Sequence, residues 1–256
     1  MSSKLIRPTL VTVALLAMPA AAIADDWNWS VTPYVWAAGV TVDVAVNDQE
    51  VLGGEVDFSD LLDDTDGGFM LHVEGRSDRV GVFGDLLYID LGHEPRFYDA
   101  FGLTIEAEAD PEVTILDLGG LYYPGGDGAG FGIHYGIRLL DVDQEIDLFA
   151  PGGVAADRRI VDVSETFTDG LVGLRYDSEF ADNWTFAISA DVSTGDTDST
   201  WSAQAVFGYK VGSSDQNQIR FGYRHLAIEL EQDDRLAEVE TDLAMSGPML
   251  GFTFGF

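Results

Sequence analysis

The chain has 256 residues, of which 45 are Asp or Glu and 13 are Lys or Arg, giving a formal net charge of −32 at pH 7. A charge of this sign excludes a nucleic-acid-binding role, which needs a basic surface. The chain contains no Cys, which excludes disulfides and a lipid anchor on an N-terminal cysteine.

The first 24 residues have the pattern of a secretory signal peptide. Lys4 and Arg7 precede an apolar run over residues 10–22, and Ala22-Ile23-Ala24 supplies the small residues of a cleavage site. The apolar run is too short for a membrane-spanning helix. We therefore predict that residues 1–24 are a signal peptide removed on export and that residues 25–256 form a single β domain.

Ten later segments alternate between apolar residues and polar or small ones, which is typical of β-strands. The connections between these segments alternate between short turns and longer, mostly acidic loops. This asymmetry is typical of outer-membrane barrels. We predict an all-β, antiparallel up-and-down transmembrane barrel of ten strands, although eight or twelve would also return both chain ends to one side. The predicted strands are residues 27–46, 68–76, 80–92, 103–123, 131–149, 160–176, 184–193, 200–211, 218–231 and 238–256.

The two faces of these strands differ in a way that favours a barrel. In the strand 131–149, Phe131 and Tyr135 share one face, whereas His134 and Arg138 share the other. A secreted soluble β-sandwich or lipocalin-like binding protein also alternates and stays an alternative. Its polar face would carry long charged side chains freely, whereas glycines and single arginines suit a narrow lumen. Asp141 and Asp143 follow, so we expect the strands to project past the membrane as a hydrophilic rim.

The last strand carries the clearest membrane signal. Leu250, Phe252, Phe254 and Phe256 share one face, and Gly251, Thr253 and Gly255 share the other. A soluble domain seldom leaves an aromatic edge strand free, because such an edge invites aggregation. A closed barrel in lipid has no free edge, and lipid accommodates the aromatic face.

Three segments carry a resemblance to small proteobacterial outer-membrane β-barrels of the porin-like or OmpA-transmembrane-domain type: residues 29–36, 84–88 and 247–256. The resemblance implies a monomer in the outer membrane of a Gram-negative bacterium, in contact with its lipids and lipopolysaccharide. It also implies that the barrel assembly machinery recognises the terminal face formed by Leu250, Phe252, Phe254 and Phe256. It implies little about activity, because one fold serves many functions.

Charged residues on the predicted inner faces form the candidate site. Buried arginines need carboxylate partners, because an unpaired ion in a low dielectric is costly. We therefore predict a charge-paired lumen with a structural or narrow passive-channel role. An anion-leaning small-solute pore stays an alternative. The predicted residues are Glu74, Arg76, Asp85, Asp117, Arg138, Arg175, Asp191, Lys210, Arg220 and Arg224.

Some small barrels are enzymes, so catalytic patterns matter. Omptin proteases carry an Asp-x-His pair at the outer rim, but Asp90 and His93 are three residues apart and point to opposite faces of a strand. Lipid A-modifying deacylases place His and Ser two apart on one strand, and no His-x-Ser occurs here. We predict that the chain is not an enzyme and needs no cofactor.

The first long connection is strongly acidic. It contains Asp57, Asp60, Asp63, Asp64 and Asp66. The run lacks the ligand spacing and the bidentate Glu of a calcium loop, so we predict no metal-ligand set and interpret it as a solvated surface. We also hypothesise that divalent cations bridge these acidic loops to lipopolysaccharide phosphates.

Overall fold

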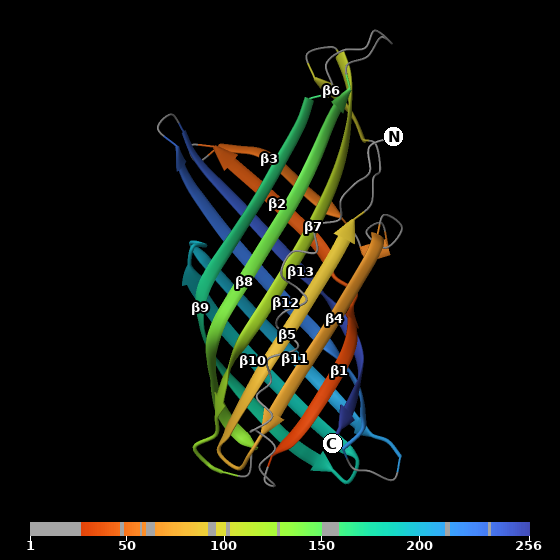
Figure 1. Cartoon of the computed structure of the whole chain (residues 1–256), viewed down its shortest axis with the longest axis vertical. Helices are drawn as coiled ribbons and strands as arrows, with labels where there is room; N and C mark the ends of the chain where they lie inside the picture. The colour runs from red at the N-terminus through yellow and green to blue at the C-terminus, as the bar shows by residue number, and fades with distance from the viewer. Residues whose placement is uncertain are drawn as a thin grey trace, which may run out of the picture.

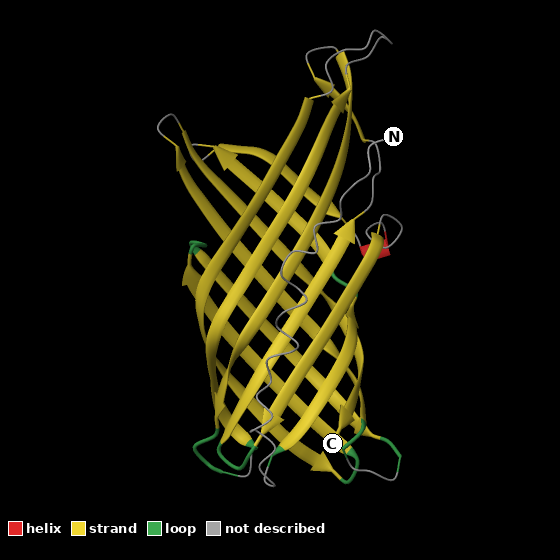
Figure 2. Cartoon of the chain, in the orientation of Figure 1, coloured by secondary structure: helices red, strands yellow, loops and turns green. Residues whose placement is uncertain are grey.

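The computed structural model describes residues 27–46, 49–56, 58–59, 65–91, 96–100, 103–126, 129–149, 159–212, 216–234 and 237–256. Antiparallel strands wind around a barrel, as Figures 1 and 2 show. No helix in these ranges is long and apolar enough to cross a membrane. The predicted signal peptide lies outside the described residues, as do His93 and the loop residues Asp57, Asp60, Asp63 and Asp64.

Ten strands close the barrel, which confirms the predicted fold class and strand number. Each strand pairs antiparallel with the next, and the first and last pair with each other. In order they are β1 (Asn28–Trp36), β4 (Thr65–Arg76), β5 (Val80–Leu91), β7 (Leu103–Tyr122), β8 (Gly130–Phe149), β9 (Arg159–Ala181), β10 (Trp184–Gly195), β11 (Ser199–Lys210), β12 (Gln218–Asp234) and β13 (Ala237–Gly255).

The seam between β1 and β13 joins the two ends of the chain. The backbone N–H of Trp29 donates to the Phe256 carbonyl at 3.0 Å, and the N–H of Phe256 donates to the Trp29 carbonyl at 2.9 Å. Further along, Val31 pairs with Phe254 and Val35 with Leu250. The aromatic last strand therefore has no free edge.

Three further strands extend the barrel. One of them lies within the predicted strand 27–46, which the structure divides in two. The other two lie where we predicted only connections, and that part of the prediction was wrong. After a break at Ala37–Ala38, β2 (Gly39–Val46) continues the path of β1 and pairs with the upper part of β13. β3 (Gln49–Val56) folds back on β2 as a hairpin, and β6 (Arg96–Ala100) pairs with β7. β13 extends past the end of β1, so its edge there is covered by β2 instead.

The barrel has two unlike ends. The four short turns that follow β4, β7, β9 and β11 lie at one end together with the C-terminus, and we call this the turn end (Figure 2). The opposite end, the loop end, is uneven because β7, β8 and β9 project beyond their neighbours (Figure 1). These three strands have 20, 20 and 23 residues, about twice the 9–11 needed to cross a bilayer.

The outer wall is apolar toward the turn end and acidic toward the loop end. On β8, Phe131 is 73% exposed and Tyr135 is 55% exposed. The same face continues past Leu139 into Asp141 and Asp143. The exposed apolar side chains belong to most strands of the barrel and include Val35, Val82, Leu118, Val172, Leu174, Ile188, Val192, Phe207, Phe221, Leu250 and Phe254.

The inner wall changes polarity in the opposite sense. Beyond Arg138 on β8 the inward residues are Leu140 and Val142, and beyond Arg224 on β12 they are Leu226 and Ile228. Within the described residues the inner wall at the loop end is therefore mainly apolar, and the acidic residues predicted for the rim, Asp141 and Asp143, lie on its outer wall. The apolar cluster inside it consists of Tyr34, Trp36, Ala38, Leu87, Ile115, Leu140, Leu226, Ile228 and Met245.

Candidate functional site: a charged network inside the barrel

The first group of ion pairs joins β4 to β9 across the lumen, toward the turn end. Arg175 donates from Nη1 to Glu74 at 2.6 Å and from Nε and Nη2 to Asp177 at 2.7 and 2.9 Å. Arg76 pairs with Glu74 and donates to Asp177 at 3.2 Å. The Tyr123 hydroxyl also donates to Asp177, at 2.9 Å. β4 and β9 are not neighbours in the sheet, so these contacts span the lumen.

A second ion pair crosses the lumen between β12 and β5. Arg224 donates from Nη1 to Asp85 and to the Tyr34 hydroxyl, at 3.0 Å in each case. The same hydroxyl donates to Asp85 at 2.9 Å. The Arg224 guanidinium also lies 5.1 Å from the Trp36 ring centroid, a cation–π contact. Trp36 belongs to the apolar cluster, so Arg224 is the point at which the charged and apolar parts of the lumen meet.

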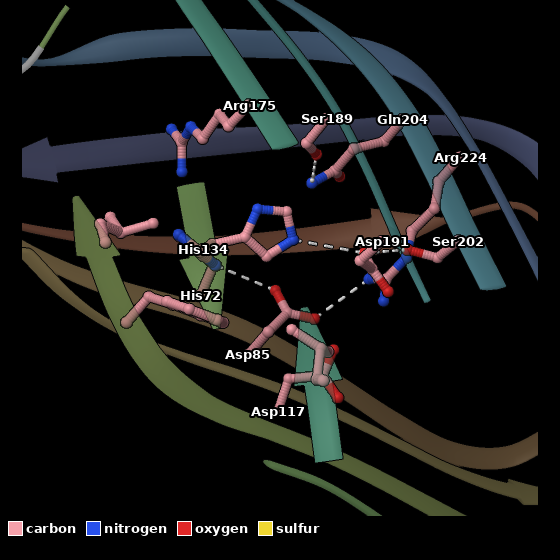
Figure 3. Close-up of a pocket in the computed structure, with 13 residues that line it drawn as sticks. His72, Asp85, Asp117, His134, Arg175, Ser189, Asp191, Ser202, Gln204 and Arg224 are labelled. Carbon is pink, nitrogen blue, oxygen red and sulfur yellow. Dashed lines mark hydrogen bonds and ion pairs between the residues drawn. The ribbon is translucent and has the colours of Figure 1, made fainter. Parts of the chain in front are cut away.

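His72 links these two ion-pair groups. Its Nδ1 lies 3.0 Å from Asp85 Oδ2, and its Nε2 lies 3.4 Å from Glu74 Oε2. Figure 3 shows His72 beside Asp85, with a dashed line joining the two. An imidazole between two carboxylates is best satisfied as the imidazolium, which donates from both nitrogens. The two groups therefore form one continuous polar network.

The third group is centred on Arg138, which is 2% exposed. Its Nε and Nη2 each donate to Asp117 at 2.8 Å, a bidentate pair, and Nη2 donates to Asp191 at 3.0 Å. The Ser193 hydroxyl accepts from Nη1 at 3.4 Å, and the Ser202 hydroxyl donates to Asp191 at 2.6 Å. Asp117 is held by the bidentate pair and Asp191 has the Ser202 hydroxyl as well as the guanidinium, so the buried charges are compensated.

Another buried carboxylate, Asp169, lies opposite Arg138 in the register of β8 and β9. It is 2% exposed. Asp169 accepts from the Ser193 hydroxyl at 3.2 Å and from the Thr197 backbone N–H at 3.1 Å. It thereby ties the turn between β10 and β11 to the network.

Two small cavities of about 50 Å³ each remain between these groups. Figure 3 shows His134 pointing into the first of them, toward Asp191; His134 Nε2 lies 3.6 Å from Asp191 Oδ2. Within the described residues, His134 Nδ1 has no hydrogen-bond partner. Gly173 faces the His134 ring closely enough that a Cβ there would collide with it. A void of this size holds a few water-sized groups.

The structure places all ten predicted charged residues on the inner wall and brings eight of them into these groups. Lys210 lies apart at the turn end and pairs with the exposed Glu179 at 2.9 Å. Arg220 makes no ion pair with any described residue. Sequence reasoning missed Asp169, Asp177 and Tyr34. Asp177 was missed because the predicted strand ended at Tyr176, whereas β9 continues to Ala181.

The residues predicted as an assembly signal lie on the outer wall. Leu250, Phe254 and Phe256 are exposed, and Phe252 packs on Phe254 with ring centroids 4.7 Å apart. Recognition of this face by an assembly machine stays a prediction. In the part of the chain that the structure describes, no group of three or more His, Asp and Glu side chains is arranged to hold a metal ion.

No protein-family model and no curated protein match the sequence, but solved structures match the fold, which is that of a Gram-negative outer-membrane β-barrel. The outer membrane protease OmpT of Escherichia coli matches with a TM-score of 0.54 and 10% identity, over 91% of this chain and 97% of that one. Weaker matches are the NalP translocator domain of Neisseria meningitidis (TM-score 0.41, 11% identity, 88% and 89% covered) and Ail of Yersinia pestis (0.36, 10%, 90% and 99%).

The likeness to OmpT and the closed ten-strand barrel confirm the resemblance to outer-membrane barrels. The likeness to OmpT also corrects one prediction, because it contradicts our expectation that the chain is not an enzyme: a protease has this same fold. At 10% identity the likeness extends to the fold alone. Asp90, which we considered for an omptin-like pair, lies on the outer wall, as does Asp143, and each is paired in register with Glu112.

Proposed function

We propose that the protein is an integral outer-membrane barrel with a closed lumen and a structural role, in which its strands carry an acidic extension above the membrane. The observation that carries this proposal is the crossing of the lumen by ion pairs. Glu74–Arg175 and Asp85–Arg224 each join strands on different sides of the barrel. A pair that spans the lumen occupies the path that a solute would take.

The apolar cluster at the loop end supports closure independently. Leu226 is fully buried, Leu87 is 1% exposed and Ile115 is 2% exposed. These side chains come from different strands and pack on one another inside the barrel. Water and ions avoid an apolar constriction of this kind, because no polar side chain there replaces the hydrogen bonds that they lose on leaving bulk water. The cluster therefore adds a dry barrier beside the charged one.

An anion-leaning pore is supported less well. Such a pore needs guanidinium groups that are available to a passing anion. Arg76, Arg138, Arg175 and Arg224 are each committed to carboxylates at hydrogen-bonding distance. A permeating anion would have to displace these partners, and its path would still end at the apolar cluster.

The remaining expectations fit this proposal. A signal peptide would export the chain, and the turn end would face the periplasm, with the loop end outside. The apolar belt would contact outer-membrane lipids, and the acidic outer wall would stand beside lipopolysaccharide. Assembly through the terminal strand, a monomeric state and divalent cations at the acidic loops belong to the proposal in the same way.

Planar-bilayer recording of the refolded protein tests closure. We expect no steady conductance steps from the wild type. Replacing Trp36 and Leu226 together by Ala, while also replacing Glu74 by Gln and Arg175 by Met, removes parts of both barriers and is expected to produce steps. The matched control is Val35→Ala, a truncation on the same strand at a lipid-facing position. Steady steps from the wild type, comparable in frequency to those of the opened variant, would refute a closed lumen.

A further inference from the structure

Arg220 differs from the other inward arginines in the partners it has. Its side chain is half-buried on the inner face of β12, and its Nε is buried without a hydrogen-bond partner among the described residues. Arg138 and Arg175, by contrast, each donate from Nε to a carboxylate at 2.8 and 2.7 Å. A guanidinium that is partly withdrawn from water and unpaired is costly, so its environment needs an explanation.

The carboxylates nearest Arg220 are already occupied. Glu74 accepts from Arg175 and Arg76, and Asp177 accepts from the same two arginines. This end of the lumen therefore holds three guanidinium groups against two carboxylates. In a chain with a net charge of −32, a local excess of positive charge at this end of the lumen is unexpected unless it serves a purpose.

A cavity of about 50 Å³ lies beside Arg220. It shares His72, Asp85, Arg175, Ser189 and Gln204 with the cavity of Figure 3, so the two are neighbouring parts of one interior space. The Asp85 carboxylate is already paired with Arg224. The Ser189 hydroxyl accepts from Gln204 Nε2 at 3.1 Å, which leaves its own hydrogen free to donate. The cavity thus presents a guanidinium and a hydroxyl donor to one small volume.

We propose that this cavity holds a small monovalent anion, of the size of chloride, paired with Arg220. The volume admits a few water-sized groups and excludes an organic anion with a carbon chain. Water alone would give Nε an acceptor, but it would leave the excess charge uncompensated. Arg220 is one inward position from Gln218, where β12 begins at the turn end, so it lies closer to that end than Arg224 on the same strand.

Thermal unfolding of the full chain in detergent micelles, at constant ionic strength, tests this site. Sodium chloride replaces sodium gluconate stepwise, because gluconate is too large for the cavity. We expect the melting midpoint of the wild type to rise and saturate with chloride, since a ligand that binds only the folded state stabilises it. Arg220→Gln is expected to lose the saturable rise.

Lys210→Gln is the matched control, because it removes an inward positive charge at the same end that already has a partner in Glu179. It should respond to chloride as the wild type does. An equal loss in both variants, or no chloride response in the wild type, would overturn the proposal. If Arg220→Gln does not fold, crystals of the wild type grown in bromide decide: an anomalous peak beside the Arg220 guanidinium supports the site, and its absence refutes it. Neither measurement depends on whether the lumen conducts.

Discussion

Replacing Arg138 by Met tests how much the buried network contributes to stability. Met keeps the length of the side chain but removes the guanidinium, so Asp117 and Asp191 lose the donors that lie 2.8 to 3.0 Å away. The Arg138, Asp117 and Asp191 side chains are 3%, 8% and 9% exposed, and solvent therefore screens little of the loss. Removing one partner of a buried ion pair typically costs about 3–5 kcal/mol, and we expect a loss of that size.

The assay is urea unfolding of the barrel in lipid vesicles, followed by tryptophan fluorescence and extrapolated linearly to water. The triple variant R138M/D117N/D191N separates two contributions to this loss: the loss of the ion pairs themselves, and the cost of leaving Asp117 and Asp191 buried without a cationic partner. Since it leaves no unpaired carboxylate, most of the stability should return, to within about 2 kcal/mol of the wild type. Arg79→Met, at the exposed turn between β4 and β5, should change stability by less than about 0.5 kcal/mol. A triple variant as unstable as R138M would show that unpaired buried carboxylates do not cause the loss of stability in R138M.

Three further predictions concern the outer wall and the seam. Tyr135→Lys, in the apolar belt, should lower the free energy of unfolding by about 2–4 kcal/mol in the same assay, the cost of a Lys near the bilayer midplane. Asp143→Lys, in the acidic part of the same strand, should be nearly neutral. Equal costs for the two variants would argue against a change from lipid to water between these positions. Three acidic residues of neighbouring strands face one another in register: Glu229, Asp242 and Asp43. Removing the central charge by Asp242→Asn should therefore stabilise the barrel by about 0.2–1 kcal/mol. This gain should shrink as the salt concentration is raised. Deleting Phe256 removes both backbone hydrogen bonds to Trp29 and should slow folding into vesicles, measured by the shift in gel mobility of the folded barrel; an unchanged rate would argue against a role for this residue in closure.

The strand pattern could be predicted because alternation is strong within the membrane belt. Along β11, for example, Trp201, Phe207 and Tyr209 face lipid while Ser202 and Gln204 face inward. The end of β9 could not be located in the same way, because Asp177-Ser178 has the composition of a turn. The structure gives the reason for the difference: Asp177 pairs with Arg175 on its own strand and with Arg76 from across the lumen.

The partners within the network could be predicted only as a set. Alternation places Glu74, Arg175 and Arg224 on inner faces, but it does not give the position of each strand around the barrel. Glu74 and Arg175 are 101 residues apart in the chain and meet across the lumen. That contact depends on the number of strands between them and on the stagger between each pair of neighbouring strands. Neither quantity can be read from the sequence of a single strand.

The inward apolar cluster was missed for a different reason, and the same reason explains why the barrel is built in two parts. Alternation shows that two faces differ, but the surroundings decide which face must be apolar. Where lipid surrounds the wall, burying apolar side chains in the lumen gains little, because lipid is as apolar as they are; polar side chains face inward there and hold the barrel together by ion pairs. Where water surrounds the wall, the hydrophobic effect favours apolar side chains inside. The change from Arg138 to Leu140 on the inner face, beside that from Leu139 to Asp141 on the outer face, marks the level at which one solvent gives way to the other.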